Sequence, residues 1–188
     1  METSLAPGFL VAAPMLQDPN FSHSLVLLVA HGEDGALGLV INRSEAVGCV
    51  GELLGQLGLR GSQATHPEPL RIGGPVAPEM GWVLFQPQGA PETELEIRLS
   101  AEVAVSPSRE VLDSIANEAG PQRYTIFLGH AGWAPGQLEE EVRIGAWLPV
   151  ALDPELVWDV PIAERWQAAF ARAGVSAAGF MTGQRGSS

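Results

Sequence analysis

The chain has 188 residues, of which 46% are hydrophobic, and a formal net charge of −12 at pH 7. This length and composition are typical of one globular domain with a sizeable core. All ten basic residues are Arg, which excludes a Walker-type phosphate loop and any chemistry that needs a lysine Schiff base. Because these Arg residues are also scattered, we expect no direct binding to nucleic acid.

Cysteine content and apolar runs set further limits. Cys49 is the single cysteine, so neither an internal disulfide nor a zinc site with several thiolates is open to the chain. The start of the sequence lacks a basic segment, and the longest apolar run, Leu25 to Ala30, is too short to span a membrane. We therefore expect a cytoplasmic protein with no membrane contact, no metal and no cofactor. The domain is expected to cover residues 1–182, followed by a disordered tail at 183–188.

The first half of the sequence is dominated by predicted strands. Apolar and β-branched runs place them at residues 8–13, 24–31, 36–42, 70–73, 81–86 and 94–105. The segment 32–35 has glycine at both ends and predicts a hairpin turn. Between the strands, Leu53, Leu54 and Leu57 share one face of a short helix over 50–57, and a loop follows at 58–68.

Helices become more frequent in the second half. Ser106 as a cap and Pro107 in the first turn predict a helix that runs to residue 119. A strand is expected at 124–128, an extended segment at 146–148 and a last helix at 161–173. Strands that stand before, between and after helices without strict alternation favour an α+β fold.

The segment 127–149 is the most informative part of the sequence. Gly129 and Gly132 are expected to bracket a turn, and a helix should begin at Pro135 and end at Gly145. Such a corner can expose backbone N–H groups that bind an anion, or it can simply pack Trp133 and Trp147. The absence of Lys and the net charge of −12 favour packing and recognition.

The polar residues of this helix have the spacing of helix surface pairs. Glu139 and Arg143 lie four residues apart in the order that favours an ion pair. Gln137 and Glu141 are the polar groups of the corner that we expect to matter most.

Three ordered blocks of the sequence resemble the YqgE/AlgH family of small bacterial proteins. They are residues 8–42, residues 72–84 with Ile-Gly-Gly-Pro-Val and Gly-Trp-Val-Leu, and residues 127–149 with Gly-His-Ala-Gly-Trp and Gly-Gln-Leu-Glu. The resemblance implies a bent, mixed, mostly antiparallel sheet rolled into a partial barrel with flanking helices. One family member is named for the regulation of alginate production, and members are often labelled transcriptional regulators.

The sequence departs from the family pattern at four places. Ser44 stands where the family often has Pro, and Phe85 where it often has His. His130 stands where Tyr is more usual, and Gly145 where Asn is more usual. These departures weaken any argument from a shared catalytic residue.

Several further residues have both a chemical and a structural interpretation. Asp18 could line a pocket or begin a turn, and His31 and His130 could be general bases or could simply lie at strand ends. Asn42 could orient a ligand or a turn. The candidate functional surface consists of Asp18, His31, Asn42, Gly73, Gly74, Pro75, His130, Gly132, Trp133, Gln137, Glu141 and Trp147.

Two hypotheses about function follow. The first is a non-enzymatic regulatory or binding module that holds a small ligand or a protein partner in an apolar groove near Trp133 and Trp147, and acts on gene expression indirectly. The second is a hydrolase or transferase that gathers His31, His130, Asp18 or Glu141 into one site. No complete catalytic motif stands in the sequence, which favours the first hypothesis. The oligomeric state stays open.

Overall fold

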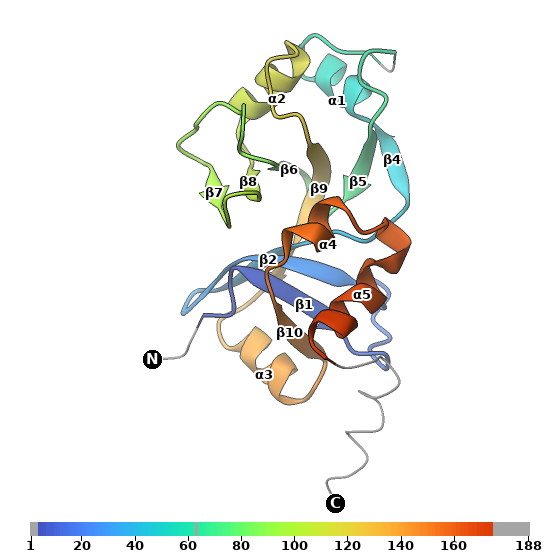
Figure 1. Cartoon of the computed structure of the whole chain (residues 1–188), viewed down its shortest axis with the longest axis vertical. Helices are drawn as coiled ribbons and strands as arrows, with labels where there is room; N and C mark the ends of the chain where they lie inside the picture. The colour runs from blue at the N-terminus through green and yellow to red at the C-terminus, as the bar shows by residue number, and fades with distance from the viewer. Residues whose placement is uncertain (1–3, 63, 175–188) are drawn as a thin grey trace, which may run out of the picture. The chain divides into compact units, whose positions relative to one another are not determined.

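The computed structural model of the chain describes residues 4–62 and 64–174 (Figure 1). Contacts divide it into two compact units, one formed by residues 1–43 and 131–188 and the other by residues 44–130. The expected tail at 183–188 lies outside the described residues.

The first unit is built on an antiparallel sheet. In order across the sheet, its strands are β10 (Trp147–Ala151), β1 (Gly8–Ala12), β2 (Leu25–Gly32), β3 (Gly35–Val40) and the end of β9 (Tyr124–Trp133). The predicted hairpin between β2 and β3 is confirmed, because Gly32 and Gly35 face each other at its tip. Strand β1 is buried throughout and β2 is buried from Leu25 to Val29, so both faces of the sheet are covered here.

Helices cover this sheet. Helix α3 (Gln137–Arg143) packs against β3 and β10, and α5 (Arg165–Arg172) packs against β1 and β2. Figure 1 shows α5 and the short α4 (Pro154–Trp158) in front of the strands and α3 at their lower end. The core between α3 and the sheet contains Trp133 and Trp147.

The second unit contains the remaining strands and two helices. Strands β6 (Val76–Phe85), β8 (Ala104–Ser106) and β7 (Ile97–Arg98) follow β9 in antiparallel order, while β5 (Pro69–Ile72) pairs with β9 in parallel and β4 (Ala46–Cys49) pairs with β5. Helices α1 (Val50–Gln56) and α2 (Arg109–Ala116) pack on the core formed by these strands. Phe85, at the position where the resembling family often has His, is fully buried in this core.

Ten strands and five α-helices are thus present in the described residues, and every strand pairing except β5–β9 is antiparallel. The strand order runs from β10 to β7 without closing. This is the α+β fold with a mostly antiparallel sheet that the sequence predicts.

Several predicted elements differ from the structure. The strand expected at 94–105 is two short strands, because Leu99 and Ser100 both donate their N–H groups to the carbonyl of Val103 and turn the chain. The helix expected to be capped by Ser106 is capped by Ser108, whose hydroxyl accepts from the N–H of Glu110. The structure also adds β4 and α4, and it replaces the first turn of the last helix with a 3-10 turn at Ile162–Glu164.

The expected turn between Gly129 and Gly132 is wrong. β9 continues through it to Trp133, because its residues beyond Gly129 pair with β3. The predicted helix end is confirmed, since Gly145 follows α3 in the left-handed conformation with φ of 78°. Asn, the more usual residue of the family there, is the other residue that enters this conformation readily, so the departure keeps the geometry.

Candidate functional site

The carboxylate of Glu141 lies at the centre of the corner between β9 and α3. Its Oε2 accepts hydrogen bonds from two indole nitrogens, Nε1 of Trp133 at 2.9 Å and Nε1 of Trp147 at 2.8 Å. Its Oε1 accepts from Nε2 of Gln137 at 2.8 Å. The amide of Gln137 also accepts from the N–H of Ala134 at 3.0 Å, so it ties the end of β9 to the first turn of α3.

The rings around this carboxylate form an aromatic cluster. Trp133 and Trp147 meet edge to face with their centroids 5.8 Å apart, and Phe21 contacts both of them. Both indoles are buried in the core of the first unit. The apolar groove was expected near Trp133, Trp147 and the glycine corner; both indoles are buried, whereas Gly132 and Gln137 are exposed and Glu141 is half-buried. Gly132 lies in β9 opposite Leu37 of β3.

His31 forms a second closed contact in the same unit. Its Nε2 lies 2.9 Å from Oε1 of Glu139, and its Nδ1 lies 3.0 Å from the backbone N of Leu5. Because the N–H of Leu5 is a donor, Nδ1 must be the acceptor, and the proton is therefore on Nε2 and points to the carboxylate. The side chain of His31 is only 4% exposed.

Glu139 is stabilised in its charged form by two donors. Its own backbone N–H and then the His31 ring hold the pKa of this carboxyl below its usual value. The expected pair between Glu139 and Arg143 is wrong. Arg143 forms a two-pronged pair with Glu140 instead, at 2.7 and 2.6 Å, because Glu139 turns toward His31.

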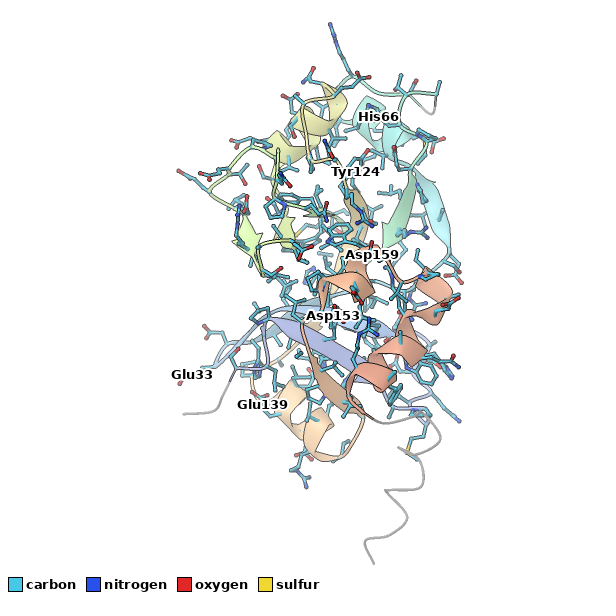
Figure 2. The ribbon with its side chains drawn as sticks, viewed as in Figure 1. Glu33, His66, Tyr124, Glu139, Asp153 and Asp159 are labelled. Carbon is cyan, nitrogen blue, oxygen red and sulfur yellow. The ribbon has the colours of Figure 1, made fainter. Side chains whose placement is uncertain are left out.

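A shallow depression of about 440 Å³ lies beside this pair in the first unit. Its lining includes the carboxylates of Glu33, Glu139 and Glu140 as well as Arg143. Figure 2 labels Glu33 near the β2–β3 turn and Glu139 on α3, and the two lie on the same side of this unit. The depression is therefore mostly acidic and open to solvent.

Two other predicted residues of this unit hold local backbone structure. Asp18 accepts from the N–H of Asn20 at 2.8 Å, which is the short-range contact of a turn. Asn42 accepts from the N–H of Leu25 at 2.8 Å and donates to the carbonyl of His23 at 2.8 Å, so it fixes the entry to β2.

The glycine loop at residues 73–75 lies in the second unit. The N–H of Gly73 donates to the carbonyl of Leu128 at 2.8 Å, so this group is already used within the protein. Gly129 has φ of 71°, and a Cβ there would lie 2.4 Å from the carbonyl oxygen of Gly74. The loop and β9 therefore approach so closely that only glycine fits at 129.

His130 follows this close approach and has a different environment from His31. Its Nδ1 is buried, and within the described residues it has no hydrogen-bond partner; the same is true of Nε1 of Trp82. The two rings meet edge to face with their centroids 5.8 Å apart. Burial lowers the pKa of His130, which favours the neutral ring.

A hollow of about 480 Å³ lies at the other end of the second unit. It is lined in part by His66, Arg60 and the hydroxyls of Ser62 and Thr65, which contact each other. Figure 2 labels His66 and, closer to the middle of this unit, Tyr124. Burial and then the charge of Glu68 and a hydrogen bond to it raise the pKa of Tyr124 well above its usual value.

Three residues of the enzyme hypothesis, Asp18, His31 and Glu141, belong to the first unit, and His130 belongs to the second. Among the described residues, His31, Asp18 and Glu141 each bond to other partners, and Nδ1 of His130 bonds to none. Within the same part of the chain, no three His, Cys, Asp or Glu side chains are placed to hold a metal ion. No helix in residues 4–62 and 64–174 is long and apolar enough to cross a membrane.

Sequence reasoning missed three contact residues. The spacing along the helix predicts that Glu139 pairs with Arg143. Its partner in the structure, His31, is 108 residues away, so no local pattern indicates it. Phe21 and Trp82 gave no local signal, since an aromatic residue beside an apolar run is typical of any core. Only a pairing of distant strands brings Trp82 opposite Phe127 and so near His130.

Comparisons with known proteins agree on one family. The family model described as AlgH-like matches residues 9–178. A UPF0301 protein of Anaeromyxobacter dehalogenans strain 2CP-1 is 46% identical, over 97% of this chain and 94% of its own length. A UPF0301 protein of Vibrio vulnificus strain YJ016 is 37% identical, over 93% of this chain and 94% of its own.

Two solved structures have a similar fold. The solution structure of the AlgH protein from Pseudomonas aeruginosa has a TM-score of 0.78 and 37% identity, and the match covers 100% of this chain and 96% of that one. The crystal structure of a Corynebacterium diphtheriae protein has a TM-score of 0.69 and 24% identity, and the match covers 92% and 88% of the two chains. None of these names states a reaction.

Proposed function

We propose that this chain, which belongs to the AlgH-like family, is a binding module without catalysis of its own that acts on gene expression through a protein partner. The observation that supports this proposal most is that two side chains of the enzyme hypothesis, His31 and Glu141, are already held by the protein. His31 and Glu141 each have their polar atoms in hydrogen bonds to other parts of the fold.

The geometry of His31 argues against general-base catalysis. A catalytic histidine uses one ring nitrogen for an orienting carboxylate and keeps the other within reach of the substrate. Here Glu139 takes Nε2, and the backbone N–H of Leu5 takes Nδ1. To accept a proton, the ring would have to give up its bond to Leu5, so His31 is better suited to fix the N-terminal segment against β2.

Glu141 is committed in a similar way. One of its oxygens accepts two indole N–H groups, and the other accepts from Gln137. A carboxylate whose two oxygens already accept three hydrogen bonds is occupied as an acceptor within the fold. In the proposal, Glu141 positions the rings of Trp133 and Trp147 and so holds α3 against the ends of β9 and β10.

The surface that we propose for the partner is the acidic depression beside α3. Glu33 and Glu140 are exposed there, and Glu139 is half-exposed beside them. Ile144, at the end of the same helix, is a large apolar residue with most of its side chain exposed. A partner of fitting chemistry would present basic side chains around an apolar anchor, and the net charge of −12 would speed the encounter.

The net charge of −12 is more consistent with an indirect action on gene expression than with direct binding to DNA. A protein that binds DNA directly must neutralise phosphates with a cluster of Arg or Lys. This chain has ten Arg against 22 acidic residues. A partner protein would therefore supply any contact with DNA.

Charge reversal tests the proposed surface. The variant Glu33→Lys/Glu140→Lys changes the depression but leaves the contact between Glu139 and His31 intact. The matched control, Glu92→Lys/Glu94→Lys, makes the same change of charge at exposed positions of the second unit. We expect the first variant to lose salt-sensitive capture of protein partners from an extract of the source cells, and the control to keep it. Equal capture by both variants would remove the support for this surface.

Turnover assays test the absence of catalysis. The enzyme alternative predicts that the wild-type protein hydrolyses some member of a panel of activated esters and phosphate esters. It also predicts that Glu141→Gln or His31→Gln abolishes this activity in a protein that is still folded. We expect neither turnover nor such a loss. Turnover that disappears in a folded Glu141→Gln variant would overturn the proposal.

A further inference from the structure

Two buried ring nitrogens in the second unit lack partners, and they belong to rings that contact each other. Nε1 of Trp82 and Nδ1 of His130 are both buried, and no group within the described residues bonds to either. The two rings meet edge to face, with centroids 5.8 Å apart and an angle of 74° between their planes. Trp82 as a whole is only 5% exposed, so its N–H cannot turn out to bulk water.

Such a pair is unusual in a folded protein. The N–H of an indole is a donor that normally finds a partner when it is buried, and most buried polar atoms do so. Elsewhere in this chain the rule holds, since the indoles of Trp133 and Trp147 donate to Glu141 and that of Trp166 donates to the carbonyl of Ala12. Two exceptions on rings that contact each other point to a site that is filled by something other than the protein.

The surroundings of the pair have the features of a small binding site. Val76 lies opposite His130 in the register of β6 and β9 and is 43% exposed, and Met80 on the same strand is 38% exposed. The pairing of these strands is interrupted between Val76 and Gly81, and Ala77 has φ of 47°, a strained value for a residue other than glycine. Exposed apolar side chains on the strand that carries Trp82, together with buried polar atoms, are the kinds of group that line a ligand pocket.

We propose that Trp82 Nε1 and His130 Nδ1 bind one uncharged oxygen atom, the hydroxyl or amide carbonyl of a small ligand whose apolar part covers Val76 and Met80. The indole can only donate, so the ligand atom must accept from it. Neutral His130 can accept from a hydroxyl at Nδ1, or it can donate from Nδ1 to a carbonyl, depending on its tautomer. This inference is independent of the acidic surface of the first unit.

Electrostatics favours an uncharged ligand over a carboxylate. Burial lowers the pKa of His130, so the ring offers no positive charge at neutral pH. Trp82 is neutral at any pH. The net charge of −12 further disfavours an anion. A carboxylate would therefore lose its hydration without gaining a cation.

The test is an NMR titration of the full-length protein labelled with ¹⁵N. The indole signal of Trp82 is followed while isobutyramide, isobutanol or isobutyrate is added, three probes with the same branched apolar body. We expect the Trp82 signal to shift with saturation for the amide or the alcohol, but not for the carboxylate. The indole signals of Trp133 and Trp147 should stay in place, because their N–H groups already have an acceptor.

The tautomer of His130 then separates the two kinds of ligand. A carbonyl ligand should place the proton on Nδ1, and a hydroxyl ligand should leave Nδ1 unprotonated. His130→Phe keeps an aromatic ring but removes the nitrogen, and we expect it to weaken probe binding about tenfold, the value of one hydrogen bond. Trp166→Phe is the control that removes an indole from the other unit and should leave binding unchanged.

Three results would overturn the proposal. The first is a Trp82 signal that none of the three probes shifts. The second is an equal response to isobutyrate, which would mean that charge does not matter. The third is an unchanged affinity in folded His130→Phe. Because the titration of the wild-type protein decides the first two, the test does not depend on whether a variant folds.

Discussion

Trp133 and Trp147 cross at 78° with ring centroids 5.8 Å apart, and their indole N–H groups converge on the same oxygen of Glu141. One carboxylate thus joins the end of β9 and the start of β10 to the helix between them. This contact explains why the segment has two Trp residues and a Glu at these positions without any catalytic role for them. Its loss should be visible as a loss of stability.

Replacing Glu141 tests this structural role. Glu141→Ala leaves two buried indole N–H groups without an acceptor, and we expect it to lower the free energy of unfolding by about 2–4 kcal/mol. Glu141→Gln keeps one acceptor oxygen and should cost about half as much. Glu140→Gln on the same helix touches only an exposed ion pair and should change stability by less than about 0.5 kcal/mol. Urea unfolding followed by Trp fluorescence gives all three values, and equal costs at 140 and 141 would contradict the assignment.

The close approach at Gly129 predicts a large effect from a single methyl group. An Ala at 129 would be in a left-handed conformation with its Cβ 2.4 Å from the carbonyl of Gly74, and we expect Gly129→Ala to cost about 2–4 kcal/mol of unfolding free energy. Gly136 has nearly the same φ, but no atom lies within 4 Å of its Cβ position. Gly136→Ala should therefore cost only about 1 kcal/mol. Thermal or urea unfolding of the two variants separates conformational strain from the clash.

Tyr124 gives a prediction about alkaline pH. Burial, followed by the charge of Glu68 and a hydrogen bond to it, raises the pKa of Tyr124 above its usual value of 10.0. Because the unfolded chain loses this proton first, the stabilisation is present below pH 10 and is lost as the pH rises above it. Tyr124 is the single tyrosine, so its ionisation can be followed by absorbance. We expect ionisation to coincide with unfolding, and Tyr124→Phe to flatten the loss of stability above pH 10. A reversible titration near pH 10 in the folded protein would contradict this.

Direct binding to DNA is predicted to be absent. The net charge of −12 and the scattered Arg residues give no surface that neutralises several phosphates. In a fluorescence anisotropy titration with duplex DNA at low salt, we expect no saturable increase up to micromolar protein. Tight binding that weakens steeply with added salt would show that a basic surface forms in spite of the charge, for instance upon association.

Much of the fold could be predicted from local patterns, and the exceptions have identifiable causes. Strands β1, β2 and β3 are apolar runs bounded by turn residues, and the hairpin has its glycines in place. The predicted strand at 94–105 failed because its turn at 99–103 contains no Gly, Pro, Asn or Asp to mark it. β9 passes through Gly129 because β3 pairs with its far end, and no local signal reports a partner so distant in the sequence.

The candidate site was less predictable than the fold. Gln137 and Glu141 bond to each other, as the rule that residues four apart share a helix face allows. The same rule failed for Glu139, because a buried histidine from β2 competes with an exposed Arg for its carboxylate. The pair of Trp82 and His130 depends on the irregular pairing of β6 with β9, which a single sequence does not reveal.

The central claim is that the polar side chains of the corner are committed to the fold and not to catalysis. The most direct measurement is the ¹⁵N NMR spectrum of the His31 ring at pH 7, assigned with the variant His31→Gln. We predict a single tautomer with the proton on Nε2, and slow exchange of that proton with water because the side chain is 4% exposed. A proton on Nδ1, or a rapidly exchanging mixture of the two tautomers, would contradict the claim, because the ring would then be free to act as a base.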